Sequence, residues 1–281
     1  MEPWLHLIPR TLTVRHLASP VVPVECHRDV PVGEVVARVQ QSIQKSQKRA
    51  TVLFDQDEDF ARFAILDWCL SDPIWLEEWR DDPISVFERE ASVETETDAD
   101  TAFAVALERF VNLNVDDTRK GRKAASGVWK PVENDQHLLV FSNGSVYGAM
   151  RSEHFRTVPV RLAVFSYLLE LEEAVMERAS ADPDAALACL SAERLSKARE
   201  LAEKKGRSSL LAGTMFCDRL TIARKMGWCC KDEGSSASSL VSRMESVRNW
   251  CAHADADSPT VFLDDLLVSI STAREMVAGL A

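Results

Sequence analysis

The chain has 281 residues, of which 46% are hydrophobic and 27% are charged, so it can bury hydrophobic cores and is not disordered throughout. At this length about two or three domains are expected. The formal net charge of −11 excludes a protein that coats nucleic acid through bulk positive charge, so any contact with RNA has to be local.

The apolar runs are too short for a membrane span. The longest uncharged one, 162–169, is far shorter than the roughly 20 residues that cross a bilayer. The N-terminus lacks the basic start, apolar middle and small-residue cleavage site of a secretory signal. Seven cysteines without a C-x-x-C pair fit reduced thiols, and the adjacent Cys229 and Cys230 offer poor geometry for a tetrahedral metal site. We therefore expect a cytoplasmic protein that holds no metal and requires no cofactor.

The first half of the chain predicts short strands alternating with helices. A helix is expected over 32–43, where Pro31 suits the first helical turn. Strands are expected over 51–54 and 63–66, on either side of the acidic turn 55–59, so that they form a hairpin.

The same order of elements returns further along the chain. A second helix is expected over 101–111, where an aspartate of the preceding Asp98-Ala99-Asp100 can cap the exposed amides. Strands over 138–141 and 146–150 enclose the dipeptide Asn143-Gly144, the strongest short-range hairpin signal, because both residues accept a positive φ. The order helix, strand, turn, strand is therefore predicted twice.

This repeat, with 13–17 leading into it, resembles the tandem cystathionine-β-synthase (CBS) domain pair, the Bateman module. The best-matching segment is 139–155, which is similar to the family's second hairpin and the start of its last helix. The resemblance implies repeats over about 13–80 and 81–155 that form a pseudo-twofold pair of small sheets flanked by helices. In this family an adenine nucleotide often occupies the cleft between the repeats.

The chain departs from the CBS pattern where a ribose would be held. Family members usually have Thr or Ser after the second strand of the hairpin and Asp three residues later. The matching positions hold Arg151 and His154 in the second repeat, and Leu66 and Cys69 in the first. Two roles for the module therefore stay open, which are binding of an adenine nucleotide and dimerisation without a ligand.

Two features of the first half lie outside the repeat. The insertion 116–135 is expected to be a solvated loop, and its basic run 119–123 is alternatively a contact for phosphate or RNA. An acidic amphipathic stretch that contains Trp68, Trp75 and Trp79 is expected to pack the two halves together.

Charge and pattern both change near residue 155. Residues 1–150 carry 16 basic and 25 acidic residues, whereas the remainder carries 17 and 19, so the two parts have net charges of −9 and −2. Beyond Thr157 apolar residues recur at three- and four-residue spacing. We therefore predict two domains, 1–155 and 156–281, in an α+β protein whose α/β module precedes an all-α bundle.

Five helices are predicted in the second domain. They are expected over 160–179, 184–205, 208–226, 236–253 and 260–280. Glycine and proline residues separate them, and five helices of this length suit a compact antiparallel bundle.

The fourth of these helices carries the one constellation with chemistry. On a helical wheel the apolar stripe consists of Leu240, Val241, Met244, Val247 and Cys251. The opposite face consists of Ser242, Ser246, Asn249 and His253. Arg248 lies at the edge of the stripe, where its long side chain can reach either face. Periodicity alone indicates a solvated polar face with a histidine that the helix dipole favours.

The six residues from Arg248 to His253, Arg-Asn-Trp-Cys-Ala-His, resemble the signature of HEPN domains (higher eukaryotes and prokaryotes nucleotide-binding). Their position near the end of the penultimate helix matches the layout of that family over about 157–281. The resemblance implies a homodimer whose twofold axis sets the two signature helices against each other around a composite cleft. In the ribonuclease members, Arg and His of this motif cut RNA without a metal and leave a 2′,3′-cyclic end.

The three site residues suit that reaction. His253 can accept or deliver a proton near neutral pH. Arg248 offers a planar fork to phosphate oxygens as negative charge grows in the transition state. Asn249 can hold the imidazole or a phosphate by a hydrogen bond. The resemblance also implies an acidic or polar residue from the first or second helix, for which Glu172 and Glu173 are the candidates.

Two interpretations of function follow. The leading one is a cytoplasmic homodimeric effector, related to toxins and defence proteins by resemblance, whose HEPN domain cleaves RNA and whose CBS-like module senses a ligand or holds the dimer together. The alternative is a non-catalytic regulator that binds an adenine nucleotide through the CBS-like pair, with a bundle that only dimerises or docks a partner. Asp255 stands where some HEPN members have a Tyr that a partner nucleotidyltransferase modifies, so that control is expected to be absent.

Overall fold

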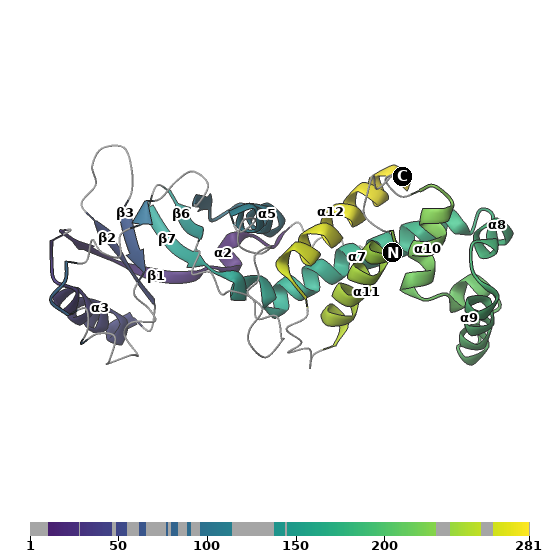
Figure 1. Cartoon of the computed structure of the whole chain (residues 1–281), viewed down its shortest axis with the longest axis horizontal. Coiled ribbons are helices and arrows are strands. Elements are labelled where there is room, and N and C mark those ends of the chain that lie inside the picture. The colour runs from purple at the N-terminus through teal and green to yellow at the C-terminus, as the bar shows by residue number, and fades with distance from the viewer. Residues whose placement is uncertain are drawn as a thin grey trace, which may run out of the picture. The chain divides into compact units, whose positions relative to one another are not determined.

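The computed structural model describes residues 11–27, 29–46, 49–54, 62–65, 77, 80–83, 89–90, 96–113, 138–143, 145–228, 237–253 and 261–280. These residues form helices and a β-sheet, which confirms the α+β class at a coarse level. The chain divides into two compact units, Thr13–Arg156 on one side and Met1–Leu12 with Thr157–Ala281 on the other (Figure 1). No helix among the described residues combines the length and the apolar character needed to cross a membrane.

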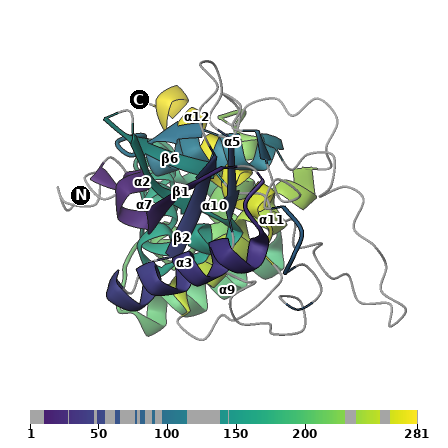
Figure 2. The ribbon, with the colours of Figure 1, turned by 90° about the vertical axis from the view of Figure 1, so that its left-hand side faces the viewer.

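The N-terminal unit, Thr13–Arg156, is built on one mixed sheet. Its described strands are β1 (Ser19–Cys26), β2 (Arg49–Phe54), β3 (Arg62–Ile65), β4 (Arg89–Glu90), β5 (Glu96–Asp98), β6 (Leu138–Ser142) and β7 (Ser145–Met150). Their order in the sheet is β4-β3-β2-β1-β7-β6-β5. The described helices of this unit are α2 (Val14–Leu17), α3 (Val32–Ser46), α5 (Phe103–Leu113) and the short 3-10 helix η3 (Ser152–Arg156). Figure 2 shows α3 beside β1 and β2, the two strands that it packs against.

The same strand–helix–strand–strand unit occurs twice in this sheet. β1 pairs with β2 in parallel across α3, and β2 pairs with β3 antiparallel. β5 pairs with β6 in parallel across α5, and β6 pairs with β7 antiparallel. Both predicted hairpins and both predicted helices are thus confirmed. The strands that precede each helix are additional, and the segment 13–17 forms the short helix α2.

The two halves of the sheet meet at β1. Six residues of this strand, from Val21 to Cys26, pair with β2. Only Ser19 and Pro20 pair with β7, opposite Ala149 and Gly148. β1 is long enough to offer one end to each half. The described strands therefore form one continuous sheet instead of the two separate sheets that the CBS resemblance implies.

Local backbone conformation and hydrogen bonds shape the turn between β6 and β7 and the turn before α5. Asn143, in the turn between β6 and β7, has a φ of 52°, the left-handed conformation that asparagine tolerates. Asp98 does not cap α5 as predicted, because its carboxylate accepts a hydrogen bond from the backbone N of Asp100 at 2.7 Å. α5 itself packs into the core through Phe110, whose ring centre lies 5.2 Å from that of Phe155.

The helical unit is organised around α7. Its described elements are α7 (Val158–Ala179), α8 (Pro183–Ala188), α9 (Ala192–Lys204), the 3-10 helix η4 (Leu210–Gly213), α10 (Phe216–Lys225), α11 (Ala237–Ala252) and α12 (Leu263–Leu280). α10, α11 and α12 all pack against α7 (Figure 1). The buried face of α7 includes Val164, Leu168, Leu171 and Val175. These four helices form the core that carries the site.

Two of the five predicted helices are wrong, because each is broken in the middle. The segment predicted as 184–205 forms α8 and α9, and the one predicted as 208–226 forms η4 and α10. Ser191 interrupts the first, since its Oγ accepts a hydrogen bond from the backbone N of Arg194 at 3.3 Å and caps α9. The second is interrupted at Thr214 and Met215, where the Asp218 carboxylate of α10 accepts a hydrogen bond from the backbone N of Met215 at 2.9 Å and so caps that helix.

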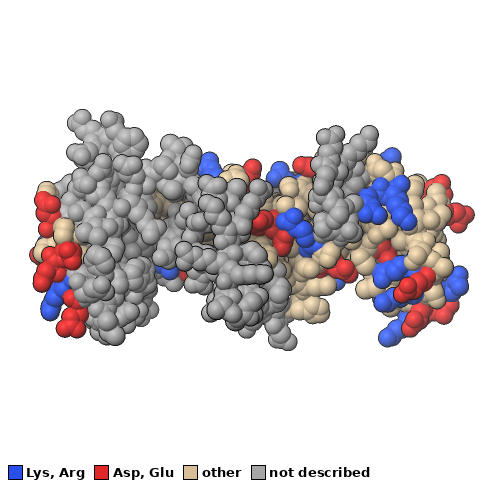
Figure 3. Space-filling model, in the orientation of Figure 1, with Lys and Arg blue, Asp and Glu red and all other residues tan. Residues whose placement is uncertain are grey.

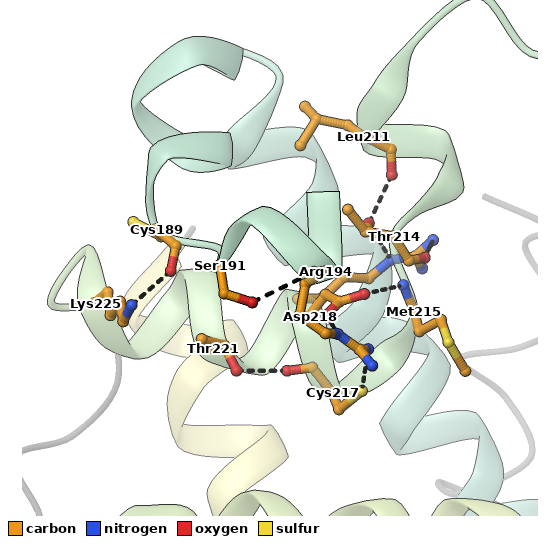
Figure 4. A network of polar contacts seen from close by, with 11 residues as sticks. Cys189, Ser191, Arg194, Leu211, Thr214, Met215, Cys217, Asp218, Thr221 and Lys225 are labelled. Carbon is orange, nitrogen blue, oxygen red and sulfur yellow. Dashed lines mark hydrogen bonds and ion pairs between the residues drawn. The ribbon is translucent and has the colours of Figure 1, made fainter. Parts of the chain in front are cut away.

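A polar network then ties α9 to α10 (Figure 4). Arg194 of α9 donates from Nε to the Asp218 carboxylate at 2.5 Å and from Nη2 to the Cys217 sulfur at 2.9 Å. Lys225 at the end of α10 donates to the carbonyl oxygen of Cys189 at 2.7 Å. The broken helices are thus held in place by side chains rather than by continuous backbone.

Several predictions fall on positions outside the described residues. They concern the acidic turn 55–59, the insertion 116–135, Leu66, Cys69, Trp68, Trp75, Trp79, Cys229, Cys230 and Asp255.

Candidate functional site

Helix α11 presents a polar face that ends at His253. Its buried side chains are Met244, Val247 and Trp250. Its exposed side chains include Ser242, Ser246 and Asn249, and His253, directly after the helix, is exposed as well. The predicted polar face is confirmed. Of the predicted apolar stripe, Met244 and Val247 are buried, whereas Leu240, Val241 and Cys251 are only partly buried. Trp250, which the predicted stripe leaves out, is buried.

Arg248 turns toward α7. Its Nε lies 3.5 Å from Oε1 of Glu172, and its guanidinium carbon lies 5.9 Å from the ring centre of Phe165. Nε is buried and has no hydrogen-bond partner, although the side chain as a whole is 33% exposed. Arg248 therefore stands at the edge of the core with part of its side chain open to solvent.

Glu172 is the acidic residue that lies beside this arginine. Its side chain is 11% exposed, and its Oε2 accepts a hydrogen bond from Nη1 of Arg219 on α10 at 2.7 Å. Glu173, the other predicted candidate, is half-buried and forms no ion pair with Arg248 in the described part of the chain. Of the two acidic candidates, the structure brings only Glu172 to the site.

Arg161 of α7 holds the end of α11. Its Nη2 donates to the carbonyl oxygens of Trp250, at 2.8 Å, and of His253, and its guanidinium carbon lies 5.0 Å from the Trp250 ring centre. The last carbonyl groups of a helix have no partners within the helix, and a cation there also suits the dipole. Arg161 therefore fixes the backbone of His253 and leaves its imidazole exposed.

Arg248 and His253 face different sides of α11 within one chain. Five residues of helix turn by about 140°, and the helical hydrogen bonding continues to His253, whose backbone N donates to the carbonyl oxygen of Asn249 at 3.1 Å. The side chains of Asn249 and His253 form no hydrogen bond or ion pair with the described residues. Within one chain, the side chains of Arg248 and His253 are therefore directed away from a common point.

Cys251 is not a nucleophile in this arrangement. Burial, opposed in part by Arg161, raises the pKa of the Cys251 thiol to about 12. The thiolate is the reactive form of cysteine, and it is scarce at neutral pH when the pKa is this high. Residues i and i+2 of a helix also point about 200° apart, so Cys251 and His253 do not form a dyad.

In the N-terminal unit, His154 is not free to hold a ribose. It is buried, and its Nδ1 accepts a hydrogen bond from the backbone N of Arg151 at 2.8 Å. This contact joins the His154 ring to the backbone of Arg151, the two positions of the second repeat that correspond to the ribose clamp of the CBS family. The nucleotide-binding alternative gains no support from this repeat.

Charges on the visible face of the helical unit are mixed. Figure 3 shows basic and acidic side chains interspersed there, without a broad basic area among the residues drawn in colour. Within the described ranges, no group of three or more His, Cys, Asp and Glu side chains could hold a metal ion. Comparisons of the chain with models of protein families, with curated proteins and with solved structures found no match.

Proposed function

We propose that the helical unit is a metal-independent endoribonuclease of the HEPN type that acts as a homodimer. Arg248 binds the scissile phosphate, His253 transfers protons and Asn249 orients one of these groups. The observation that supports this most directly is the end of α11, where an exposed imidazole and an exposed amide lie on one side and a half-exposed guanidinium lies on the other. The N-terminal unit, in this proposal, senses a ligand or holds the dimer together.

The reaction requires two proton transfers. The ribose 2′-oxygen loses its proton and attacks phosphorus, and the 5′-oxygen of the next nucleotide leaves with a proton, which gives a 2′,3′-cyclic phosphate. Two copies of the chain supply two imidazoles, one as base and one as acid. Arg248 opposes the charge that develops on the phosphoryl oxygens.

Incubation of the purified protein with total RNA, with and without EDTA, tests this function. We expect equal cleavage in both, fragments with 2′,3′-cyclic ends, and no cleavage of RNA whose riboses are 2′-O-methylated. His253→Ala and Arg248→Ala are each expected to lower the cleavage rate by about 100-fold or more, because each removes a group that acts in the transition state. Asn249→Ala is expected to lower it by about tenfold.

His27→Ala is the matched control, because it removes an exposed histidine of the N-terminal unit. It should cleave RNA at the rate of the unaltered protein. A His253→Ala variant that retains full activity would refute the catalytic assignment, and cleavage that EDTA abolishes would refute metal independence.

A further inference from the structure

Glu172 is shared unequally between two arginines. Its Oε2 accepts a full hydrogen bond from Arg219 Nη1 at 2.7 Å, whereas its Oε1 lies 3.5 Å from Arg248 Nε. Both Oε1 of Glu172 and Nε of Arg248 are buried without a hydrogen-bond partner. Charge-assisted hydrogen bonds of this kind are usually about 2.7–2.9 Å long, so Arg248 forms an ion pair with the carboxylate but no hydrogen bond.

Arg219, which binds the Glu172 carboxylate, is itself anchored by Thr214. Its Nε donates to Thr214 Oγ1 at 3.4 Å and its Nη2 to the Thr214 carbonyl oxygen at 3.3 Å. Thr214 is fixed in turn, because its hydroxyl donates to the carbonyl oxygen of Leu211 at 2.6 Å. The Arg219 side chain is only 19% exposed. The Arg219 guanidinium is thus held on one side by the two neutral oxygens of Thr214, and the Glu172 carboxylate compensates its charge.

The charges of this cluster leave room for an anion. One carboxylate faces two guanidinium groups, so the three side chains together carry one surplus positive charge. Arg248 is the more exposed of the two arginines, and within the described residues none of its nitrogens forms a hydrogen bond. Without Arg219, the Glu172 carboxylate would be attracted to Arg248, since a guanidinium can bind a carboxylate through two parallel hydrogen bonds.

We propose that Arg219 is a positioning residue, which holds Glu172 away from Arg248 and so keeps the Arg248 guanidinium available for a phosphate of the substrate. This inference rests on the proposed ribonuclease function for the identity of the phosphate. It assigns no contact with RNA to Arg219 itself.

Three variants separate positioning from charge and from folding. Arg219→Gln removes the group that holds Glu172. Arg224→Gln is the matched control, because it removes one positive charge from an exposed position of the same helix. The double variant Glu172→Gln/Arg219→Gln also removes the carboxylate that would capture Arg248. All measurements are made at a temperature where circular dichroism shows each variant to be folded. Arg219→Met, which also removes the cation but keeps an apolar side chain of similar length, replaces Arg219→Gln with the same expected results if the latter does not fold.

Binding of a 2′-O-methylated RNA, which cannot be cleaved, is measured at one fixed salt concentration. We expect Arg219→Gln to bind about tenfold more weakly, because Arg248 is then engaged by Glu172, and the double variant to recover to within about threefold. Arg224→Gln should stay within about twofold. With cleavable RNA, the loss in Arg219→Gln should appear in KM more than in kcat. The proposal is overturned if Arg219→Gln binds the RNA as tightly as the unaltered protein does. It is also overturned if the double variant binds no more tightly than Arg219→Gln.

The Arg248 Nε–H group gives a readout that does not depend on RNA. Its 15N-correlated NMR signal is assigned by its loss in Arg248→Lys. In Arg219→Gln the proton should move downfield, because a hydrogen bond to Glu172 forms, and in Arg224→Gln it should not move. An unmoved signal in Arg219→Gln overturns the proposal. A moved signal in a protein that binds no RNA supports the proposed positioning and refutes only the ribonuclease function.

Discussion

The Cys251 thiol lies on α11 between the residues assigned to catalysis, and its burial makes one contribution to how stability depends on pH. Burial raises the pKa of this thiol to about 12 in the folded protein, whereas thiols of an unfolded chain ionise near pH 8.5. Between these values the unfolded chain releases a proton that the folded protein keeps. The stabilising contribution is therefore complete below about pH 8.5 and is lost progressively as the pH rises toward 12.

We expect Cys251→Ala to remove this dependence. The free energy of unfolding of the unaltered protein should fall more steeply between about pH 9 and pH 11 than that of the variant, because the variant lacks the Cys251 thiol while its other six cysteines are unchanged. Urea denaturation at a series of pH values measures the difference. Parallel pH dependences for the two proteins would contradict the burial of this thiol.

At the level of elements, the contact of η4 with α9 leaves no space for a side chain at Gly213. A Cβ there would lie 1.8 Å from the carbonyl oxygen of Ala198 and 2.9 Å from the backbone N of Ala202. Both neighbours are helical backbone, which cannot give way as a flexible side chain does. Gly213→Ala is therefore expected to lower the free energy of unfolding by about 3 kcal/mol.

Gly279 near the end of α12 is the matched control. A Cβ at this position meets nothing within 4 Å, so Gly279→Ala should leave stability unchanged or raise it by up to about 1 kcal/mol through helix propensity. Urea denaturation compares the two variants. Equal effects at both glycines would show that η4 does not pack closely on α9.

The elements differ in how well their residues predict them. α7, α11 and α12 follow from an uninterrupted helical period. The breaks at Ser191 and at Met215 do not, because Leu190 and Leu211 continue the apolar period near them and are buried in one cluster. β1 and β5 are missed as well: prolines interrupt the apolar run of β1, and β5 has only three residues.

The residues of the site also differ in how well the sequence predicts them. Arg248, Asn249 and His253 can be picked out from sequence because they stand close together on one helix. Glu172 was only one of two acidic candidates. Arg219 and Arg161 could not be predicted, because they lie 47 and 89 residues from Glu172 and Trp250, the partners they contact. Only the packing of α10 and α11 on α7 brings these partners together.

For the whole molecule, the proposed site requires two copies of α11 to face each other across a twofold axis. A residue near such an axis contacts its own counterpart. We expect Ser246→Cys, an exposed position on the same face as Asn249 and His253, to form a disulfide between two chains under mild oxidation. Non-reducing electrophoresis should then show a species of twice the chain's mass.

Ser196→Cys on the exposed side of α9 is the control, since it gives the chain the same additional thiol at a distance from α11. It should form this species no faster than the unaltered protein does. If sedimentation finds a monomer, or if Ser196→Cys cross-links as readily as Ser246→Cys, then α11 is not the dimer contact and the shared cleft is ruled out.

The seam at β1 has a consequence for how the sheet of the N-terminal unit twists. Only Ser19 and Pro20 join the two half-sheets, and proline has no N–H to donate across the gap. Each half-sheet retains its own hairpin and parallel pair when that seam opens. A change in the mutual twist of the two halves would therefore be taken up at this junction, where the described backbone ladder holds two residue pairs.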